Sequence, residues 1–296
     1  TMPTAFGEKC VLRIFDPDTT AKDFTQLGFA SEEETIWRSM IVQPHGIVLV
    51  TGPTGSGKTT TLYTTLRYLA APEVNVCTIE DPIEMVVPEL NQMQVQPAID
   101  LTFAQGIRTL LRQDPDIIMV GEIRDLETAQ MAVQAALTGH LVLSTLHTND
   151  ACSAITRLLD LGIPHYLIQN VLIGVMAQRL TRTLCPHCKE NARMDDGLWE
   201  ALVRPWSLPK PEAVGAPHGC PECRNTGYLG RVGLYELLRI TPELRRLCQA
   251  DVDEDALRHA AFEQGMRPLR ISAALQIIAG LTTFEEVAQS LPPLEH

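Results

Sequence analysis

The sequence predicts an α/β fold with a mostly parallel sheet, followed by a smaller, mainly helical C-terminal part. Two observations lead to this prediction. Four short apolar runs alternate with helical segments between residues 47 and 144, and from about residue 184 paired cysteines, prolines and short amphipathic helices replace that alternation. Alternating strands and helices form a parallel sheet that helices cover on both faces.

The four apolar runs are predicted strands because each is short, largely apolar and rich in β-branched residues. They span residues 47–50, 74–79, 117–120 and 141–144. A helix is predicted over residues 126–137, with Asp125 as its N-cap and Gly139 at its end. Strands of this kind belong to the interior of a sheet.

Helix caps and turn residues predict the elements outside this core. Ser31 and Glu34 form a capping box for a first helix that ends near residue 42, and Thr282 and Glu285 form one for the last helix. Another helix is expected over residues 253–263. The glycine-rich stretch from Thr226 to Glu236 is a hairpin candidate, and residues 10–15 are a candidate strand.

These elements divide the chain into six expected segments, two of which are short terminal pieces. They are residues 1–22 (remnant of a preceding domain), 23–46 (linker and first helix), 47–183 (α/β core), 184–240 (tetracysteine subdomain), 241–293 (C-terminal helical subdomain) and 294–296 (tag remnant).

Composition narrows the class of protein. The chain of 296 residues is 45% hydrophobic and carries a net charge of −12. No apolar run reaches the ~18 residues of a membrane helix, and no secretory signal sequence opens the chain, so a cytoplasmic protein is expected. Proteins that grip nucleic acid through its phosphates are usually basic. The acidic total therefore argues against a nucleic-acid partner.

Residues 52–59 match the phosphate-binding pattern G-x-x-x-x-G-K-[ST] in full, between a predicted strand and a helical segment. Backbone N–H groups of such a loop, and of the helix that follows, bind phosphate oxygens. The lysine reaches the β- and γ-phosphates, and the final hydroxyl binds Mg²⁺. The predicted site for ATP and Mg²⁺ consists of Gly52, Pro53, Thr54, Gly55, Ser56, Gly57, Lys58 and Thr59.

Acidic side chains follow the second and third strands, where ligands of parallel sheets bind. Glu122 is the candidate for the carboxylate that places the attacking water. Gly121 stands where many P-loop enzymes have an aspartate, which leaves part of the Mg²⁺ coordination to Glu80, Asp81 or water. Glu84 is a further candidate. An ion-paired or helix-capping carboxylate is the alternative for each.

Two histidines flank the fourth strand. His147 follows it and could sense the γ-phosphate, and His140 precedes it at a helix–strand turn. Both are candidate catalytic residues, with a structural histidine as the alternative.

Four segments in this order resemble the boxes of a known family. Residues 52–59, 80–84, 116–125 and 138–149 look like the Walker A, Asp box, Walker B and His box of the type II secretion and type IV pilus assembly ATPases, most similar to the GspE/PulE type II secretion group. The resemblance covers nearly the whole chain as the C-terminal portion of such a protein. It implies a RecA-like core and a homo-hexamer with active sites between subunits.

The resemblance also implies partners and further site residues. Members of the family associate peripherally with the inner membrane through the cytoplasmic domains of secretion platform proteins. Arginines from other parts of the ring complete their site, and the matching positions are Arg13, Arg108 and Arg124. A guanidinium near the γ-phosphate would stabilise the transition state. A surface or ion-paired arginine is the alternative at each position.

Two Cys-x-x-Cys pairs indicate a metal site. Four thiolates with this spacing form a tetrahedral, structural Zn²⁺ site, and binding of the metal would help a proline-rich segment with little core to fold. A redox pair is the alternative. The ligands are Cys185, Cys188, Cys220 and Cys223.

Together these features predict an ATP-hydrolysing motor of a bacterial type II secretion system, which moves a membrane-embedded pilus-like assembly. A type IV pilus assembly ATPase is the alternative within the family, and a pilus-retraction motor is disfavoured by the cysteine pairs. A nucleic-acid-binding zinc module is the alternative from a different class.

Overall fold

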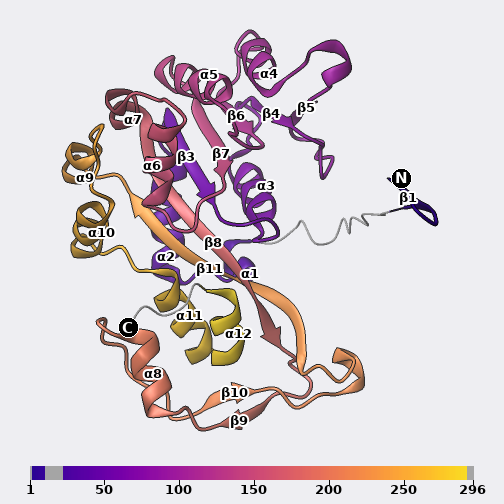
Figure 1. The fold of residues 1–296 in the computed structure, drawn as a ribbon, viewed down its shortest axis with the longest axis vertical. Helices are drawn as coiled ribbons and strands as arrows, with labels where there is room; N and C mark the ends of the chain where they lie inside the picture. The colour runs from indigo at the N-terminus through magenta and orange to yellow at the C-terminus, as the bar shows by residue number, and fades with distance from the viewer. Residues whose placement is uncertain (1, 11–22, 292–296) are drawn as a thin grey trace.

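The computed structural model describes residues 2–10 and 23–291 and has a seven-stranded sheet at its centre (Figure 1). The strands follow the order β11-β8-β3-β7-β6-β4-β5. Six of them are parallel, and only the edge strand β11 runs antiparallel, to β8. This arrangement confirms the predicted mostly parallel α/β sheet.

The sheet contains the four predicted strands and three others. The four are β3 (Gly46–Thr51), β4 (Val76–Glu80), β6 (Ile117–Val120) and β7 (Leu141–Leu146). The three others are β5 (Asn91–Gln94), β8 (Leu172–Leu184) and β11 (Tyr228–Arg239). The predicted hairpin between Thr226 and Glu236 is wrong, because β11 is a single long strand that pairs with β8.

Twelve α-helices and four short strands complete the described part of the chain. The helices are α1 (Phe24–Leu27), α2 (Ser31–Ile41), α3 (Lys58–Leu69), α4 (Phe103–Leu110), α5 (Leu126–Leu137), α6 (Ser153–Asp160), α7 (His165–Val171), α8 (Asp196–Val203), α9 (Pro242–Leu247), α10 (Glu254–Glu263), α11 (Leu269–Ile278) and α12 (Phe284–Ser290). The strands β1 (Met2–Thr4) and β2 (Gly7–Lys9) form one hairpin, and β9 (Glu190–Ala192) pairs with β10 (Val214–Ala216).

Helices cover the two faces of the sheet as two separate apolar layers. Alternate residues of a strand point to opposite faces, and in β3 Ile47 and Leu49 face the layer of α4 to α7, α9 and α10, whereas Val48 and Val50 face α1 to α3. All four side chains are buried. The fully buried β3 thus supports the P-loop from inside the core.

Helix α5 and its Asp125 cap are confirmed: Asp125 Oδ1 accepts a hydrogen bond from the Thr128 N–H. Two predicted caps are displaced by one residue. Helix α2 is capped at Ala30, whose N–H donates to the Glu33 side chain, rather than at Ser31. Thr283 rather than Thr282 caps α12, because the Thr282 hydroxyl donates to the backbone oxygen of Arg182.

The predicted boundaries after residues 183 and 240 do not follow the packing. Residue 183 lies inside β8, and β11 beyond it belongs to the central sheet. Helices α9 and α10 pack on the core layer, whereas α8, α11 and α12 share a third apolar cluster with Leu234 of β11. The C-terminal helices are therefore divided between two cores.

The expected strand over residues 10–15 and the expected tag remnant lie wholly or mostly outside the described residues. Within the described part of the chain, no helix is both long and apolar enough to cross a membrane.

Candidate nucleotide-binding site

The P-loop, residues 52–59, connects β3 to the first turn of α3 and lies against β8. Gly52 and Gly57 adopt φ angles of 146° and 87°, which favour glycine. A Cβ on Gly52 would lie 2.4 Å from the Gln178 carbonyl oxygen, and a Cβ on Gly57 would lie 2.9 Å from Gln178 Nε2. Close packing on β8 therefore requires glycine at both positions and fixes the course of the loop.

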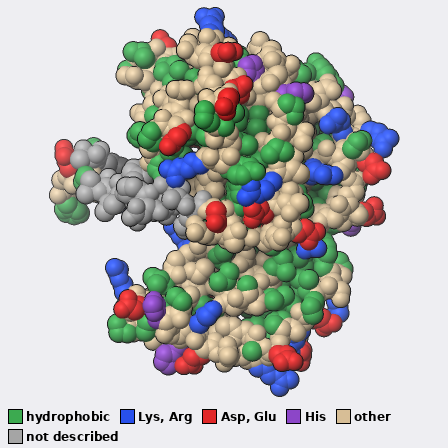
Figure 2. Space-filling view, turned by 180° about the vertical axis from the view of Figure 1, so that it is seen from behind, with side chains coloured by type: hydrophobic (Ala, Val, Ile, Leu, Met, Phe, Trp, Pro, Cys, Tyr) green, Lys and Arg blue, Asp and Glu red, His purple; other side chains and the backbone are tan. Residues whose placement is uncertain are grey.

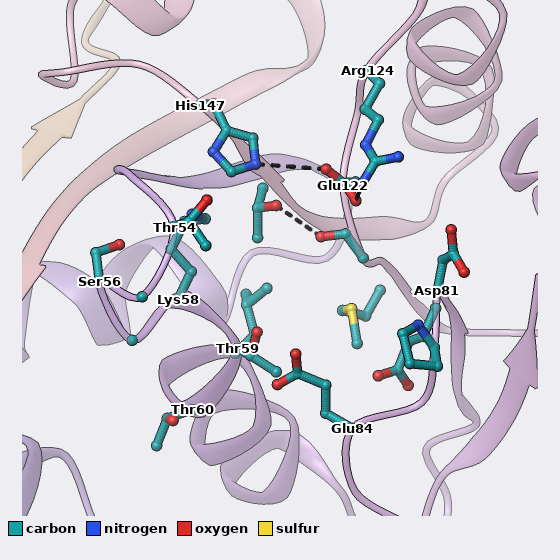
Figure 3. A pocket seen from close by; sticks show the side chains of 18 of the residues that line it. Thr54, Ser56, Lys58, Thr59, Thr60, Asp81, Glu84, Glu122, Arg124 and His147 are labelled. Atoms are coloured by element: carbon teal, nitrogen blue, oxygen red, sulfur yellow. Dashed lines mark hydrogen bonds and ion pairs between the residues drawn. The ribbon is translucent and has the colours of Figure 1, made fainter. Parts of the chain in front are cut away.

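A cavity of about 590 Å³ opens at the carboxyl ends of β3, β4, β6 and β7. In Figure 3 the P-loop side chains border one side of it, and side chains that follow the other strands border the rest. Of the residues predicted from the sequence, the structure brings the following into its wall: Thr54, Gly55, Ser56, Gly57, Lys58, Thr59, Glu80, Asp81, Glu84, Glu122, Arg124 and His147.

Two P-loop side chains have polar atoms suited to phosphate. Lys58 Nζ donates to the backbone oxygens of Gly52 (2.8 Å) and Pro53 (3.0 Å). Burial lowers the pKa of Lys58, and the nearby Glu122 carboxylate opposes that shift. Ser56 Oγ is buried and has no hydrogen-bond partner among the described residues. A phosphate oxygen would satisfy both groups.

Glu122 lies at the end of β6 between two basic side chains. One of its oxygens is 2.5 Å from Arg124 Nη2 and the other is 3.5 Å from His147 Nε2, and its side chain is 16% exposed. Figure 3 shows the three groups together at one edge of the cavity. Glu122 is thus both ion-paired, as the alternative held, and placed at the cavity.

The structure explains the glycine at position 121. A Cβ there would lie 3.3 Å from the carbonyl oxygen of Ile79 on the adjacent β4. A side chain at this position would press on the neighbouring strand, so the acidic groups of this site come from Glu80 and Glu122 instead. Glu80 is 4% exposed and accepts hydrogen bonds from the hydroxyls of Tyr63 and Thr78.

Two of the predicted catalytic residues do not line this cavity within the chain. His140 precedes the amino end of β7, and its Nδ1 contacts the Ala135 carbonyl oxygen at 2.9 Å. Arg108 lies on α4, where it donates to Gln105 Oε1. Gly52 and Pro53 of the predicted phosphate-binding loop also lie outside the cavity wall. Arg13 lies outside the described residues.

Several lining residues were missed, and two of them, Leu180 of β8 and Arg231 of β11, come from the antiparallel edge of the sheet. β8 was not predicted, and the stretch that holds Arg231 was interpreted as a local hairpin, so neither residue was connected with the site.

The four paired cysteines form a second cluster at the far end of β8 and β11. All four Sγ atoms lie within 4.8 Å of one another, with three Sγ–Sγ distances of 3.8 Å. Backbone N–H groups of Cys220 and Gly227 donate to Cys223 Sγ, and the Gly219 N–H donates to Cys188 Sγ. Burial alone would raise the pKa of Cys223, but hydrogen bonds from the Cys220 and Gly227 amides, together with those from the Cys220 and Cys188 side chains, lower it to about 6. Such a cluster could hold a metal ion.

A complete P-loop after a buried strand, facing carboxylates at the tips of parallel strands, defines a P-loop protein that binds nucleoside triphosphates. The chain belongs to the family described as type II/IV secretion system protein, whose model matches residues 1–289. The predicted family and its ATPase class are confirmed.

The curated relatives include proteins of type IV pilus assembly and of type II secretion. The chain is 56% identical to the type IV pilus assembly ATPase TfpB of Acinetobacter baylyi, over 99% of this chain and 50% of that protein. It is 50% identical to the type II secretion system protein HxcR of Pseudomonas aeruginosa and 47% identical to the type II secretion system ATPase E of Vibrio cholerae, in each case over 97% of this chain. These alignments cover 57% and 56% of those relatives. The chain thus spans about half the length of the curated relatives it matches.

Solved structures agree with this assignment. The pilus retraction motor PilT with bound ADP matches at a TM-score of 0.65 and 29% identity, over 90% of this chain and 66% of PilT. The Legionella pneumophila ATPase DotB matches at a TM-score of 0.66 and 25% identity, over 91% of this chain and 65% of DotB. Both share the mostly parallel α/β architecture.

Proposed function

We propose that this chain is the ATP-hydrolysing part of a motor of bacterial type II secretion. The observation that carries the proposal is the complete P-loop facing Glu80 and Glu122 across one cavity. The direct test is ATP turnover by the purified protein in the presence of Mg²⁺. We expect turnover that stops when Mg²⁺ is chelated, whereas a protein that neither binds nor hydrolyses ATP contradicts the proposal.

Different residues around the cavity would have different roles in hydrolysis. P-loop amides and Lys58 would hold the phosphates, and the Thr59 hydroxyl with Glu80 or Asp81 would hold Mg²⁺, which neutralises phosphate charge when bound. Glu122 would accept a proton of the attacking water and orient it. Arg124 and His147 would keep the Glu122 carboxylate in place, and the Arg124 guanidinium adds positive charge beside it.

Type IV pilus assembly is the second candidate, and one observation favours it. The identity to the pilus assembly ATPase TfpB is 56%, against 50% to the secretion protein HxcR. Deleting the gene in the source bacterium separates the two functions. Accumulation of exported proteins inside the cell, with normal surface pili, supports secretion, and loss of pili with normal export supports pilus assembly.

A ring of six subunits would account for predicted residues that lie away from this cavity. The Arg108 side chain is 48% exposed and lies outside the cavity of its own chain, so it is available to the site of a neighbouring subunit, a role also proposed for Arg13. The hexamer would work in the cytoplasm, bound at the inner membrane to the cytoplasmic domains of platform proteins.

The nucleic-acid alternative finds no support in the charge distribution. The net charge is −12. On the face shown in Figure 2, Lys and Arg side chains lie among Asp and Glu side chains and form no continuous basic stripe. A groove that follows a phosphate backbone needs such a stripe.

The metal proposed for the cysteine cluster is Zn²⁺, in a structural role. A tetrahedron with metal–sulfur bonds of about 2.3 Å has edges of about 3.8 Å, and three edges of the cluster measure 3.8 Å. Four thiolates leave no ligand position open for a substrate. The N–H donors to sulfur would further stabilise bound thiolates.

Removal of the metal is expected to loosen the segment between β8 and β11 while the sheet remains folded. The segment has only a two-stranded antiparallel sheet, α8 and the short 3-10 helix Pro221–Cys223 of its own, so metal binding would supply much of its stability. Hydrogen exchange after chelation should show lost protection in residues 185–227 and retained protection in β3 and α3. A Cys248→Ser variant is the control, since Cys248 is buried in the core layer. Unchanged protection of residues 185–227 would contradict the structural role.

A further inference from the structure

Glu80 is held by three donors that come from three different elements. Its Oε2 accepts from the Tyr63 hydroxyl of α3 at 2.6 Å. Its Oε1 accepts from the Thr78 hydroxyl of β4 at 2.6 Å and from Gln92 Nε2 of β5 at 3.2 Å. Tyr63, Thr78 and Glu80 are all buried. A carboxylate in the wall of an open cavity usually needs fewer hydrogen-bond donors from the protein, because water can solvate it.

The hydrogen atoms of this network can be assigned. Tyr63 has one hydroxyl hydrogen, and its shorter contact is the one to Glu80, since the Met85 carbonyl oxygen is 3.0 Å away. Gln92 Nε2 supplies the Met85 carbonyl oxygen at 2.7 Å and has a second hydrogen for Tyr63 Oη or Glu80 Oε1. The Tyr63 and Thr78 hydroxyls and the Gln92 amide thus face the Glu80 carboxylate, whose two oxygens accept hydrogen bonds from them.

Tyr63 remains a donor because its phenol does not ionise. Burial raises the pKa of Tyr63 well above its ordinary value, and the hydrogen bond to Glu80 raises it further. A neutral phenol next to an ionised carboxylate forms a charge-assisted hydrogen bond, which is shorter and stronger than a neutral one.

The side chains of Tyr63 and Gln92 also connect Glu80 to the rest of the site. Tyr63 lies on α3, the helix that begins at Lys58 of the P-loop. Gln92 Oε1 accepts from the Val87 N–H at 2.7 Å, and its Nε2 holds the Met85 carbonyl oxygen. Gln92 thus anchors the loop after β4, which carries Asp81 and Glu84 into the cavity.

We propose that Tyr63 and Gln92 are positioning residues, which hold the Glu80 carboxylate at a fixed place relative to the P-loop so that it can serve ATP hydrolysis. The inference rests on the proposed ATPase function and adds two residues to its site. Neither residue lines the cavity, so each acts on the reaction only through Glu80 and the loop that Gln92 anchors.

The test is a Tyr63→Phe variant of the purified protein. The change removes one hydroxyl and keeps the buried ring. We expect kcat to fall about tenfold to hundredfold, as for a misplaced catalytic group, with the KM for ATP unchanged. Gln92→Met, which keeps the side-chain volume, should have the same effects.

Tyr235→Phe is the matched control. Tyr235 is also a buried tyrosine, and its hydroxyl donates to a backbone oxygen, that of Leu27, at 2.9 Å. It lies outside the cavity wall. The control should lose a similar amount of thermal stability, with kcat unchanged.

A Glu80→Gln background separates positioning from a general loss of structure. If Tyr63 acts through Glu80, Tyr63→Phe should lower kcat further by much less in Glu80→Gln than in the wild-type protein. Equal effects in both backgrounds, or a wild-type kcat in Tyr63→Phe and Gln92→Met, would overturn the inference alone. Absence of ATP turnover in the wild-type protein would instead contradict the proposed function.

Discussion

Replacing Lys58 with alanine is expected to eliminate productive ATP binding. The lysine is the one P-loop side chain with a positive charge, and its ammonium group lies in the wall of the cavity. Loss of a donor aimed at the transferred phosphate lowers turnover by about 10²- to 10³-fold. ATP turnover and the binding of a fluorescent ATP analogue would both be measured, and we expect both to be lost.

The variant also tests whether the loss is local. Lys58 Nζ donates to two backbone oxygens of the P-loop, so its removal should lower the free energy of unfolding by only ~1 kcal/mol. Lys210→Ala is a control, because Lys210 pairs with Asp196 away from the cavity. Unchanged turnover in Lys58→Ala would show that the triphosphate binds elsewhere.

Glu122→Gln should separate binding from chemistry. The amide keeps the size of the side chain but lacks the negative charge that orients water and takes up its proton. We expect ATP to bind with nearly the wild-type Kd while kcat falls by about 10²- to 10³-fold, the range found when an electrostatic group aimed at the transition state is removed. Binding by calorimetry and turnover by phosphate release would be compared on one preparation.

Two variants check the interpretation of Glu122→Gln. Glu200→Gln neutralises an exposed carboxylate of α8 that pairs with Arg204, and it should have wild-type turnover. Arg124→Ala removes the partner that lies 2.5 Å from Glu122. If Glu122 served only that ion pair, Arg124→Ala and Glu122→Gln would lower kcat equally. A wild-type kcat in Glu122→Gln would remove Glu122 from the reaction.

The centre of the sheet could be predicted from the sequence because its strands are apolar on both faces. β8 could not, although it is largely buried. Gln178, Arg179 and Thr181 are buried within it, and they break the apolar pattern that identifies a strand. Gln178 accepts from the Thr61 hydroxyl, and Arg179 donates to the Asn149 backbone oxygen. These polar residues are stable inside only because of partners distant in sequence, which a local pattern does not contain.

The residues of the site likewise divide into those that could be predicted from the sequence and those that could not. The P-loop, Glu80 and Glu122 were predictable because each follows directly on a strand, and the tips of parallel strands meet. His140 lies at the opposite end of β7 from His147 and does not line the cavity. Arg231 enters the cavity from β11, whose pairing with β8 joins residues far apart in the chain. The sequence motifs therefore located the carboxylates of the site. They did not locate residues such as Arg231, which reach the site only because distant parts of the chain pair in the sheet.

The pairing of β8 with β11 determines where the chain can be truncated. A gene cut after residue 183 would encode the P-loop and every predicted carboxylate, yet its product would lack β11. β8, without its last residue, would then become a long edge strand with its backbone N–H and C=O groups unpaired on one side, which invites aggregation. The smallest fragment with an intact sheet must therefore extend through residue 239, with the cysteine-bearing segment retained as an internal insertion.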